Sequence, residues 1–154
     1  MKKWIIALIA ALATPSLAMS DERMEEWYKT VEGQYAVMES VHGGLFATLA
    51  ISHAGNIRVY LKALQPDHCA EYGERILDHD PLYVNGTLVK YSQQCHGEWN
   101  YFHATTAKGS EYLVEQFRTS RSVEVRTVED ISFVFSAMGF IDAYNEYTNL
   151  SDAL

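Results

Sequence analysis

The sequence is poor in basic residues, in proline and in cysteine. Its 154 residues include 12 Lys or Arg against 20 Asp or Glu, which gives a net charge of −8. Proteins that bind the nucleic-acid backbone carry a basic face, so this acidic balance argues against that class. Only 3 prolines are present and 48% of the residues are hydrophobic, which excludes a disordered chain. A chain of this length forms one domain rather than two.

Long hydrophobic runs are also lacking: none approaches the roughly 18 apolar residues that a transmembrane helix needs. The apolar run at residues 4–13 follows Lys2 and Lys3 and precedes small residues at Ser16 and Ala18. These three parts are typical of a secretory signal peptide. We predict a signal peptide at residues 1–18, cleavage near Ala18, and one domain at residues 19–154. Cleavage removes two lysines and no acid, so the net charge changes from −8 to −10.

The signal peptide predicts a protein of the Gram-negative periplasm, or a secreted one, with no stable membrane insertion after cleavage. Cys69 and Cys95 are the 2 cysteines, and they form no Cys-x-x-Cys redox motif. In an oxidising compartment the default for such a pair is a disulfide. A Cys69–Cys95 bridge would add about 3.5 kcal/mol to the free energy of unfolding in the chain-entropy account.

Hydrophobic spacing predicts two to four helices. Gly33 weakens the second half of the first one, so in an alternative interpretation residues 34–40 form a strand. The predicted helices are residues 20–38, a short helix from Pro66, a helix from Thr105 or Thr106 to about residue 119, and a last helix from Gly139 to about residue 147.

Alternating apolar and polar residues predict strands between these helices. The strongest local pattern is Asn85-Gly86 between two β-prone runs, which indicates a type I′ hairpin because both central residues need a positive φ. The other predicted strands are residues 45–51, 57–62, 99–103, 122–128 and 131–135. We therefore expect an α+β fold: one small domain with an antiparallel sheet of about six strands, two to four helices and one disulfide.

Catalytic and metal-binding motifs are absent from the sequence. Its 6 histidines form no His-x-x-x-His and no Cys/His zinc spacing. The densest cluster of potential ligands is Asp78-His79-Asp80, which we interpret as a solvated loop before Pro81. There is no nucleophile elbow, no Ser-x-x-Lys motif and no phosphate-binding glycine loop. The sequence thus predicts a protein that is not an enzyme and holds no metal or cofactor, with a small metal-dependent hydrolase as an alternative.

The second half of the chain follows an ordered series of motifs. These are Trp99 at the start of a strand, a Phe-x-Ala step at Phe102 and Ala104, a helix with Tyr112, Leu113 and Phe117, a Val123-Glu124-Val125 strand, and a Phe-rich run at residues 133–140 that enters a helix. This series resembles the ending of small periplasmic accessory proteins, including type VI secretion-associated and prophage-encoded ones. The resemblance covers about residues 82–145 and implies a non-enzymatic accessory or binding protein, with no functional residues to carry over.

The remaining function class is protein binding. An acidic exported domain is steered towards basic partners, which include many enzymes that act on the cell envelope. We therefore expect an inhibitor or immunity-type protein that binds another, basic protein, with a structural subunit of an envelope or secretion complex as an alternative. The predicted contact residues lie in aromatic or polar positions near the disulfide: His79, Asp80, Tyr83, His96 and Trp99.

Overall fold

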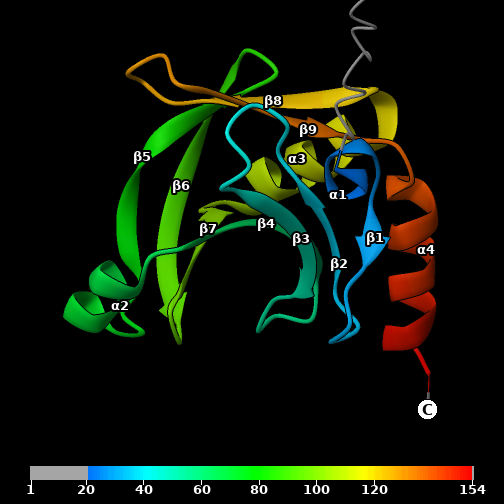
Figure 1. Cartoon of the computed structure of the whole chain (residues 1–154). Coiled ribbons are helices and arrows are strands. Elements are labelled where there is room, and N and C mark those ends of the chain that lie inside the picture. Colours follow the sequence, from blue (N-terminus) through cyan, green and yellow to red (C-terminus); the bar gives the residue numbers. More distant parts are fainter. Residues whose placement is uncertain (1–20, 154) are drawn as a thin grey trace, which may run out of the picture.

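A computed structural model describes residues 21–153, so the predicted signal peptide lies outside the described residues. In these residues nine strands form one antiparallel sheet, in the spatial order β1-β2-β3-β4-β7-β6-β5-β8-β9 (Figure 1). The strands are β1 (Tyr28–Lys29), β2 (Tyr35–Met38), β3 (Phe46–Ile51), β4 (Ile57–Leu64), β5 (Leu77–Val84), β6 (Thr87–His96), β7 (Trp99–Ala104), β8 (Ser122–Arg126) and β9 (Ser132–Ser136). The helices are α1 (Glu22–Glu25), α2 (Pro66–Tyr72), α3 (Ala107–Thr119) and α4 (Phe140–Ser151).

The α+β class is confirmed, but the sheet has nine strands rather than about six. The predicted helix at residues 20–38 is wrong beyond residue 25, and its alternative as a strand is confirmed by β2. The helix ends at Glu25, since Glu26 is already extended, and Gly33, with a φ of +82° and an N–H that donates to Thr30 O at 2.9 Å, closes a turn between β1 and β2. Strand β1 was not predicted, because a strand of two residues is too short to show a hydrophobic alternation in the sequence.

The Asn85-Gly86 hairpin is confirmed. The φ angles of these residues are +44° and +83°, and the turn joins β5 to β6. The interpretation of residues 78–80 as a loop is wrong, because they belong to β5. A bulge between His79 and Leu82 interrupts the pairing at Pro81, and it keeps both His79 and Leu82 in the cavity described below.

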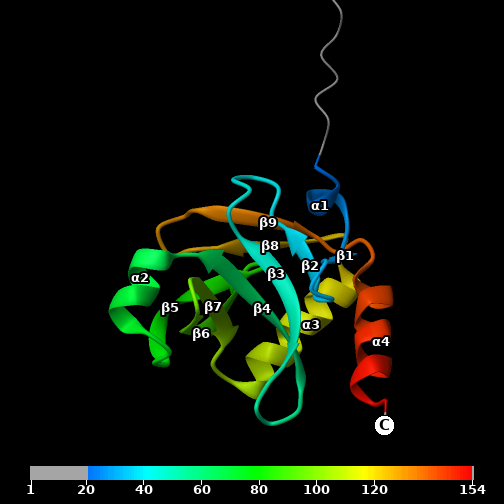
Figure 2. The same ribbon diagram turned by 60° about the horizontal axis from the view of Figure 1, so that its bottom comes forward.

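The two edges of the sheet meet, so that the sheet curls almost into a barrel (Figure 2). Just after β2, the Ser40 N–H donates to Val134 O of β9 at 2.8 Å. Just before β1, Trp27 donates from its backbone N–H to Met138 O at 2.9 Å and from its indole Nε1 to Ser136 O at 3.1 Å. These bonds satisfy edge groups that would otherwise face solvent.

Helix α3 lies against the inner face of the curled sheet and fills one end of it. Thr106 caps the helix as predicted, since its hydroxyl accepts from the Gly109 N–H at 3.0 Å. Leu113 and Phe117 are fully buried, and the Phe117 ring packs edge-on against Trp27 with centroids 5.3 Å apart. This aromatic contact joins the helix to the seam where the sheet closes.

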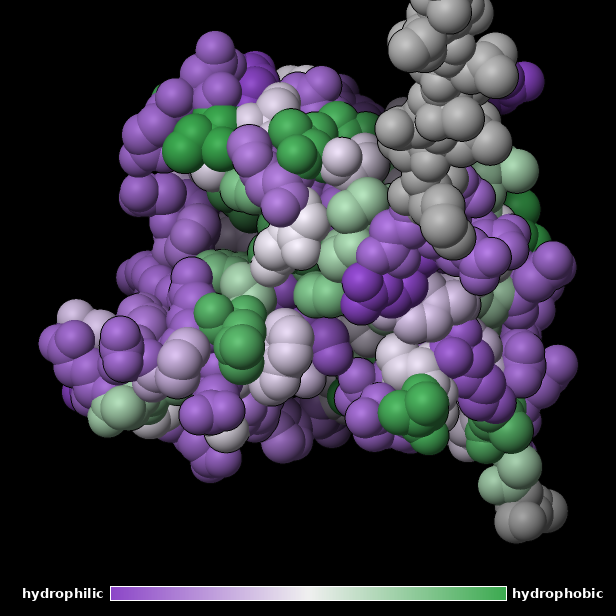
Figure 3. Space-filling view, viewed as in Figure 1, coloured by the Kyte–Doolittle hydropathy of each residue, from purple (hydrophilic) through white to green (hydrophobic). Residues whose placement is uncertain are grey.

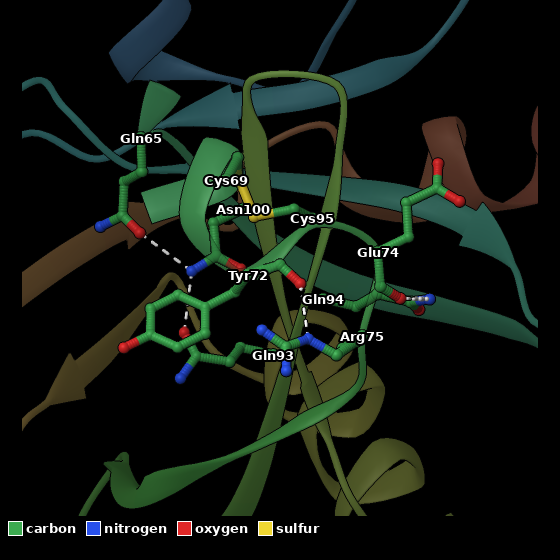
Figure 4. The surroundings of a disulfide bond; sticks show 9 residues. All are labelled: Gln65, Cys69, Tyr72, Glu74, Arg75, Gln93, Gln94, Cys95 and Asn100. Carbon is green, nitrogen blue, oxygen red and sulfur yellow. Dashed lines mark hydrogen bonds between the residues drawn. A yellow bond between two sulfur atoms is a disulfide. The ribbon is translucent and has the colours of Figure 1, made fainter. Parts of the chain in front are cut away.

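The Cys69–Cys95 disulfide is confirmed, with the Cα atoms 5.5 Å apart (Figure 4). It joins α2 to β6. Asn100 of β7 lies beside it, and its Nδ2 donates to Gln65 Oε1 at 2.9 Å and to Gln93 Oε1 at 2.8 Å. Covalent and polar links therefore fix α2 on the sheet. No helix within residues 21–153 is long and apolar enough to cross a membrane.

Candidate functional site

The end of the inner sheet face that α3 leaves uncovered forms an open cavity of about 310 Å³, which we call the apolar groove. Strand β7 shows the division: Ala104 packs under Gly109 of α3, whereas Phe102, two residues earlier on the same face, lines the groove. Most of the lining is apolar: Leu45, Leu61, Ala63, Leu82, Phe102, Val125 and Phe133. Figure 3 shows a hollow in the surface with hydrophobic residues gathered around it.

His79 is the one titratable side chain among the described residues that line the groove. Its ring packs edge-on against Phe102, with centroids 5.0 Å apart, and its Nδ1 lies 2.7 Å from the backbone oxygen of Asp80. Gln65 and Thr127 add the remaining polar side chains of the lining. With one imidazole and no nucleophile–base pair, this arrangement is suited to holding an apolar group rather than to acid–base or covalent chemistry.

One wall of the groove is the loop between β2 and β3, and Glu39 shapes it. The Glu39 side chain is fully buried, and its carboxylate accepts the backbone N–H groups of Val41 at 2.7 Å, His42 at 2.8 Å and Gly44 at 3.2 Å. Satisfying three donors with one carboxylate fixes the path of the loop. Gly44 and the next residue then line the groove.

The two loops that border the groove expose aliphatic side chains. Val41 follows β2, and Val128 and Ile131 lie in the turn between β8 and β9; each is about half exposed (54%, 49% and 49%). Ile131 stands two residues before Phe133, so the alternation of the chain continues the groove's apolar surface outwards. These exposed aliphatic side chains enlarge the apolar surface beside the cavity.

The turn between β8 and β9 is also acidic. Arg126 is its only cation in residues 122–132, and it pairs with Asp130 at 2.7 Å and with Glu124 at 3.7 Å. Glu129 at the tip forms no ion pair within the described residues. Asp80, next to His79 on the other side of the groove, is exposed and also unpaired there. The mouth of the groove therefore combines an apolar rim with surplus negative charge.

The structure places the five predicted contact residues in two groups. His79 lines the groove, with Asp80 and Tyr83 on the same strand, and the Tyr83 ring lies 4.6 Å from the guanidinium of Arg126. His96 and Trp99 face each other across the β6–β7 hairpin, away from the groove. No experiment on binding bears on either group, so all five stay predictions.

Sequence reasoning missed Phe102, Phe133 and Glu39 as site residues. The alternation at residues 131–135 predicted a strand with Phe133 in it, but it could not show that α3 would leave this end of the sheet uncovered. Glu39 carried no signal, because a single acid before a glycine pair is ordinary in a turn.

Within residues 21–153, no three His, Cys, Asp or Glu side chains lie close enough together to hold a metal ion. The Asp78-His79-Asp80 cluster thus supplies no set of metal ligands. Comparison of the chain with protein-family models, with curated proteins and with solved structures found no match. The resemblance of residues 82–145 to periplasmic accessory proteins therefore stays a prediction from the sequence.

Proposed function

We propose that the protein is exported to the periplasm and acts by binding another protein through the apolar groove. The observation that carries this proposal is the groove itself: an apolar cavity of about 310 Å³ whose bordering loops expose Val41, Val128 and Ile131. A small ligand would contact the cavity alone and would make no use of the apolar side chains outside it. Apolar side chains that continue outside it add contact area for a larger partner.

The charge around the groove selects the kind of partner. Glu129 and Asp80 are exposed and unpaired in the described part of the chain, and the chain as a whole is acidic. A partner segment with an apolar anchor side chain flanked by Lys or Arg complements this mouth in both shape and charge. In its most concrete form, the proposal is inhibition of, or immunity to, a basic enzyme that acts on the cell envelope.

The support for export is the three-part N-terminal segment of the sequence, together with a disulfide that persists in oxidising compartments. Amino-terminal sequencing of the protein recovered from the periplasm tests this part. Cleavage next to Ala18 is the expected result, and recovery of an uncleaved chain from the cytoplasm would contradict it.

Capture from a periplasmic extract tests the binding site. Immobilised mature protein should retain a basic protein at about 50 mM salt and release it at about 500 mM, because screening weakens exposed charge pairs. Ile131→Glu places a charge on the groove rim and should abolish capture. Ile141→Glu is the matched control: Ile141 is 54% exposed on α4, away from the groove, and this variant should retain the partner.

Equal capture by the two variants would show that the groove is not the binding site, and failure to retain any basic protein at low salt would refute the partner class. The identity of the captured protein separates the two forms of the proposal. An envelope-degrading enzyme supports inhibition or immunity, whereas a structural component of a secretion or envelope complex supports an accessory subunit.

A further inference from the structure

A second cavity, of about 580 Å³, lies on the opposite face of the sheet, and we call it the outer pocket. Its floor consists of outward-facing side chains from four adjacent strands, and the turn between β3 and β4 forms one wall. Tyr60 of β4 and Tyr101 and His103 of β7 contribute rings to the floor. The pocket has the size of a small-molecule site and is separate from the apolar groove.

The charge of the outer pocket is opposite to that of the chain. Its lining includes Arg58 and the three imidazoles of His53, His96 and His103, but no Asp or Glu among residues 21–153. This is a marked local exception in a protein with 20 acidic and 12 basic residues. A pocket lined by an arginine and by no described carboxylate favours an anionic ligand.

Arg58 is the one permanent cation among the described residues that line the outer pocket. It also borders a neighbouring cavity lined by Glu111 and Glu115 of α3, yet it forms no ion pair within residues 21–153. Lys62, four residues further along the same face of β4, lies beside the pocket rather than in its lining and likewise forms no ion pair there. Its Nζ donates to Gln34 Oε1 at 3.0 Å and lies 5.0 Å from the ring centre of Trp99.

The surroundings of these cations are partly dehydrated. Burial lowers the pKa of Lys62, although nearby Glu32 opposes this, and burial together with the charge of Arg58 lowers the pKa of His103. Holding cations in such a place without a direct ion pair weakens the fold, and a bound anion would offset the cost.

The aromatic and neutral polar side chains define the rest of the ligand. The rings of Tyr60 and Tyr101 lie 6.3 Å apart at 77°, and the ring of His103 lies 5.8 Å from that of Tyr60. Gln34 and Gln94 add amide groups that donate and accept hydrogen bonds. The aromatic side chains can pack against the apolar face of a cyclic ligand, and the amides around them can hydrogen-bond to its polar groups. This combination matches a ligand ring that bears hydroxyl groups.

We propose that the outer pocket binds an acidic saccharide: a sugar ring that carries a carboxylate or a phosphate group. Arg58 binds the anionic group, the aromatic rings contact the sugar ring, and the amides of Gln34 and Gln94 hydrogen-bond its hydroxyl groups. This proposal is independent of protein binding in the apolar groove, because the two sites lie on opposite faces of the sheet.

Titration of the mature protein with D-glucuronate and with D-glucose 6-phosphate tests the proposal by calorimetry and by tryptophan fluorescence. Trp27 is buried in the core, whereas Trp99 lies near the border of the pocket, since the Lys62 ammonium is 5.0 Å from its ring and 5.8 Å from that of Tyr101; calorimetry supplies the direct measurement of binding. At least one acidic sugar should bind at least about tenfold more tightly than D-glucose and than inorganic phosphate. Binding of glucuronate alone assigns a carboxylate ligand, and binding of the phosphate ester alone assigns a phosphate ligand.

Arg58→Gln should weaken that binding about tenfold or more, because it removes the charged donor and keeps most of the side chain. Arg121→Gln is the matched control, since Arg121 is exposed and lies between α3 and β8, outside the pocket. The proposal is overturned if neither acidic sugar binds below about 10 mM, a weak limit by the usual affinity scale, if D-glucose binds equally well, or if the two variants lose the same affinity.

Discussion

Phe102 and His103 are neighbours on β7, but Phe102 lines the apolar groove and His103 lines the outer pocket on the other face of the sheet. The alternation of side chains along a strand accounts for this division. Phe102 contacts the His79 ring, whereas His103 lies 5.8 Å from the Tyr60 ring. One strand thus supplies a ring to each site, and each site can be altered without touching the other.

The partly buried His103 gives the fold a defined pH dependence. Its pKa is lowered by burial first and by Arg58 second, and the lining of the pocket adds the Tyr60 ring but no described carboxylate. The unfolded chain therefore binds a proton at His103 at higher pH than the folded protein does. The contribution of neutral His103 to the free energy of unfolding is complete above the pKa of the unfolded chain, about 6.5. This contribution is lost as the pH falls from there through the lower pKa of the folded protein.

Urea unfolding of the wild type and of His103→Gln at pH 7.5 and pH 5.5, on either side of that value of about 6.5, measures this contribution. The wild type should lose more free energy of unfolding between the two pH values than the variant does, because glutamine does not titrate. Identical losses in the two proteins would contradict the prediction.

Glu39 should be the most sensitive acidic position for stability. Glu39→Ala leaves three backbone N–H groups of the β2–β3 loop without their acceptor, and we expect a loss of about 2–3 kcal/mol in the free energy of unfolding. Glu129→Ala, at an exposed site, should change it by less than about 0.5 kcal/mol. Denaturant unfolding compares the two, and similar effects would show that Glu39 does not hold the loop.

Removal of the Tyr91 hydroxyl should not lower the free energy of unfolding. The hydroxyl oxygen is buried without a hydrogen-bond partner in the described chain, and burial raises the pKa of this phenol far above its usual range. Tyr91→Phe should therefore leave the free energy of unfolding unchanged or raise it by about 1 kcal/mol.

Tyr112→Phe is the matched control for that experiment. The Tyr112 hydroxyl donates to Val84 O at 3.2 Å and lies 3.0 Å from Thr87 Oγ1, so its removal should cost about 1 kcal/mol. A greater loss of stability in Tyr91→Phe than in Tyr112→Phe would contradict the assignment of Tyr91 as unpartnered.

Removing the disulfide should cost about 3.5 kcal/mol of unfolding free energy on the chain-entropy scale, since its cysteines are 26 positions apart. The double variant Cys69→Ser/Cys95→Ser and the reduced wild type should lose similar amounts in denaturant titrations. Reductant should then have no effect on the double variant. A loss below about 1 kcal/mol in both would show that α2 stays in place through its hydrogen bonds alone.

Local patterns predicted the local structure well. The Asn85-Gly86 pair correctly predicted a hairpin, and Thr106 correctly predicted the start of a helix. The alternation at Ile57, Val59 and Leu61 correctly predicted a strand. Each of these features depends on residues that are neighbours in sequence. The first helix prediction failed because residues 20–38 also fit a helical face, whereas in the structure residues 36–38 pair with β3 and belong to β2.

Neither site could be predicted in this way. The apolar groove depends on contacts such as His79 with Phe102, and the outer pocket depends on β4 pairing with β7. The sequence provides both sets of residues but not the strand order that brings them together. His96, predicted as a partner contact, lines the outer pocket, and the strand order that brings it there was not visible in the sequence.

The seam that closes the sheet also sets when the protein can fold. The Ser40 and Val134 segments are 94 positions apart, and those of Trp27 and Ser136 are 109 apart. Contacts of such high contact order form slowly, since long loops must be ordered first. During synthesis, strands β1 to β4 can pair with their neighbours in sequence, but the seam cannot close until nearly the whole chain has emerged. The curled sheet of a nascent chain therefore stays open along its first edge until synthesis is almost complete.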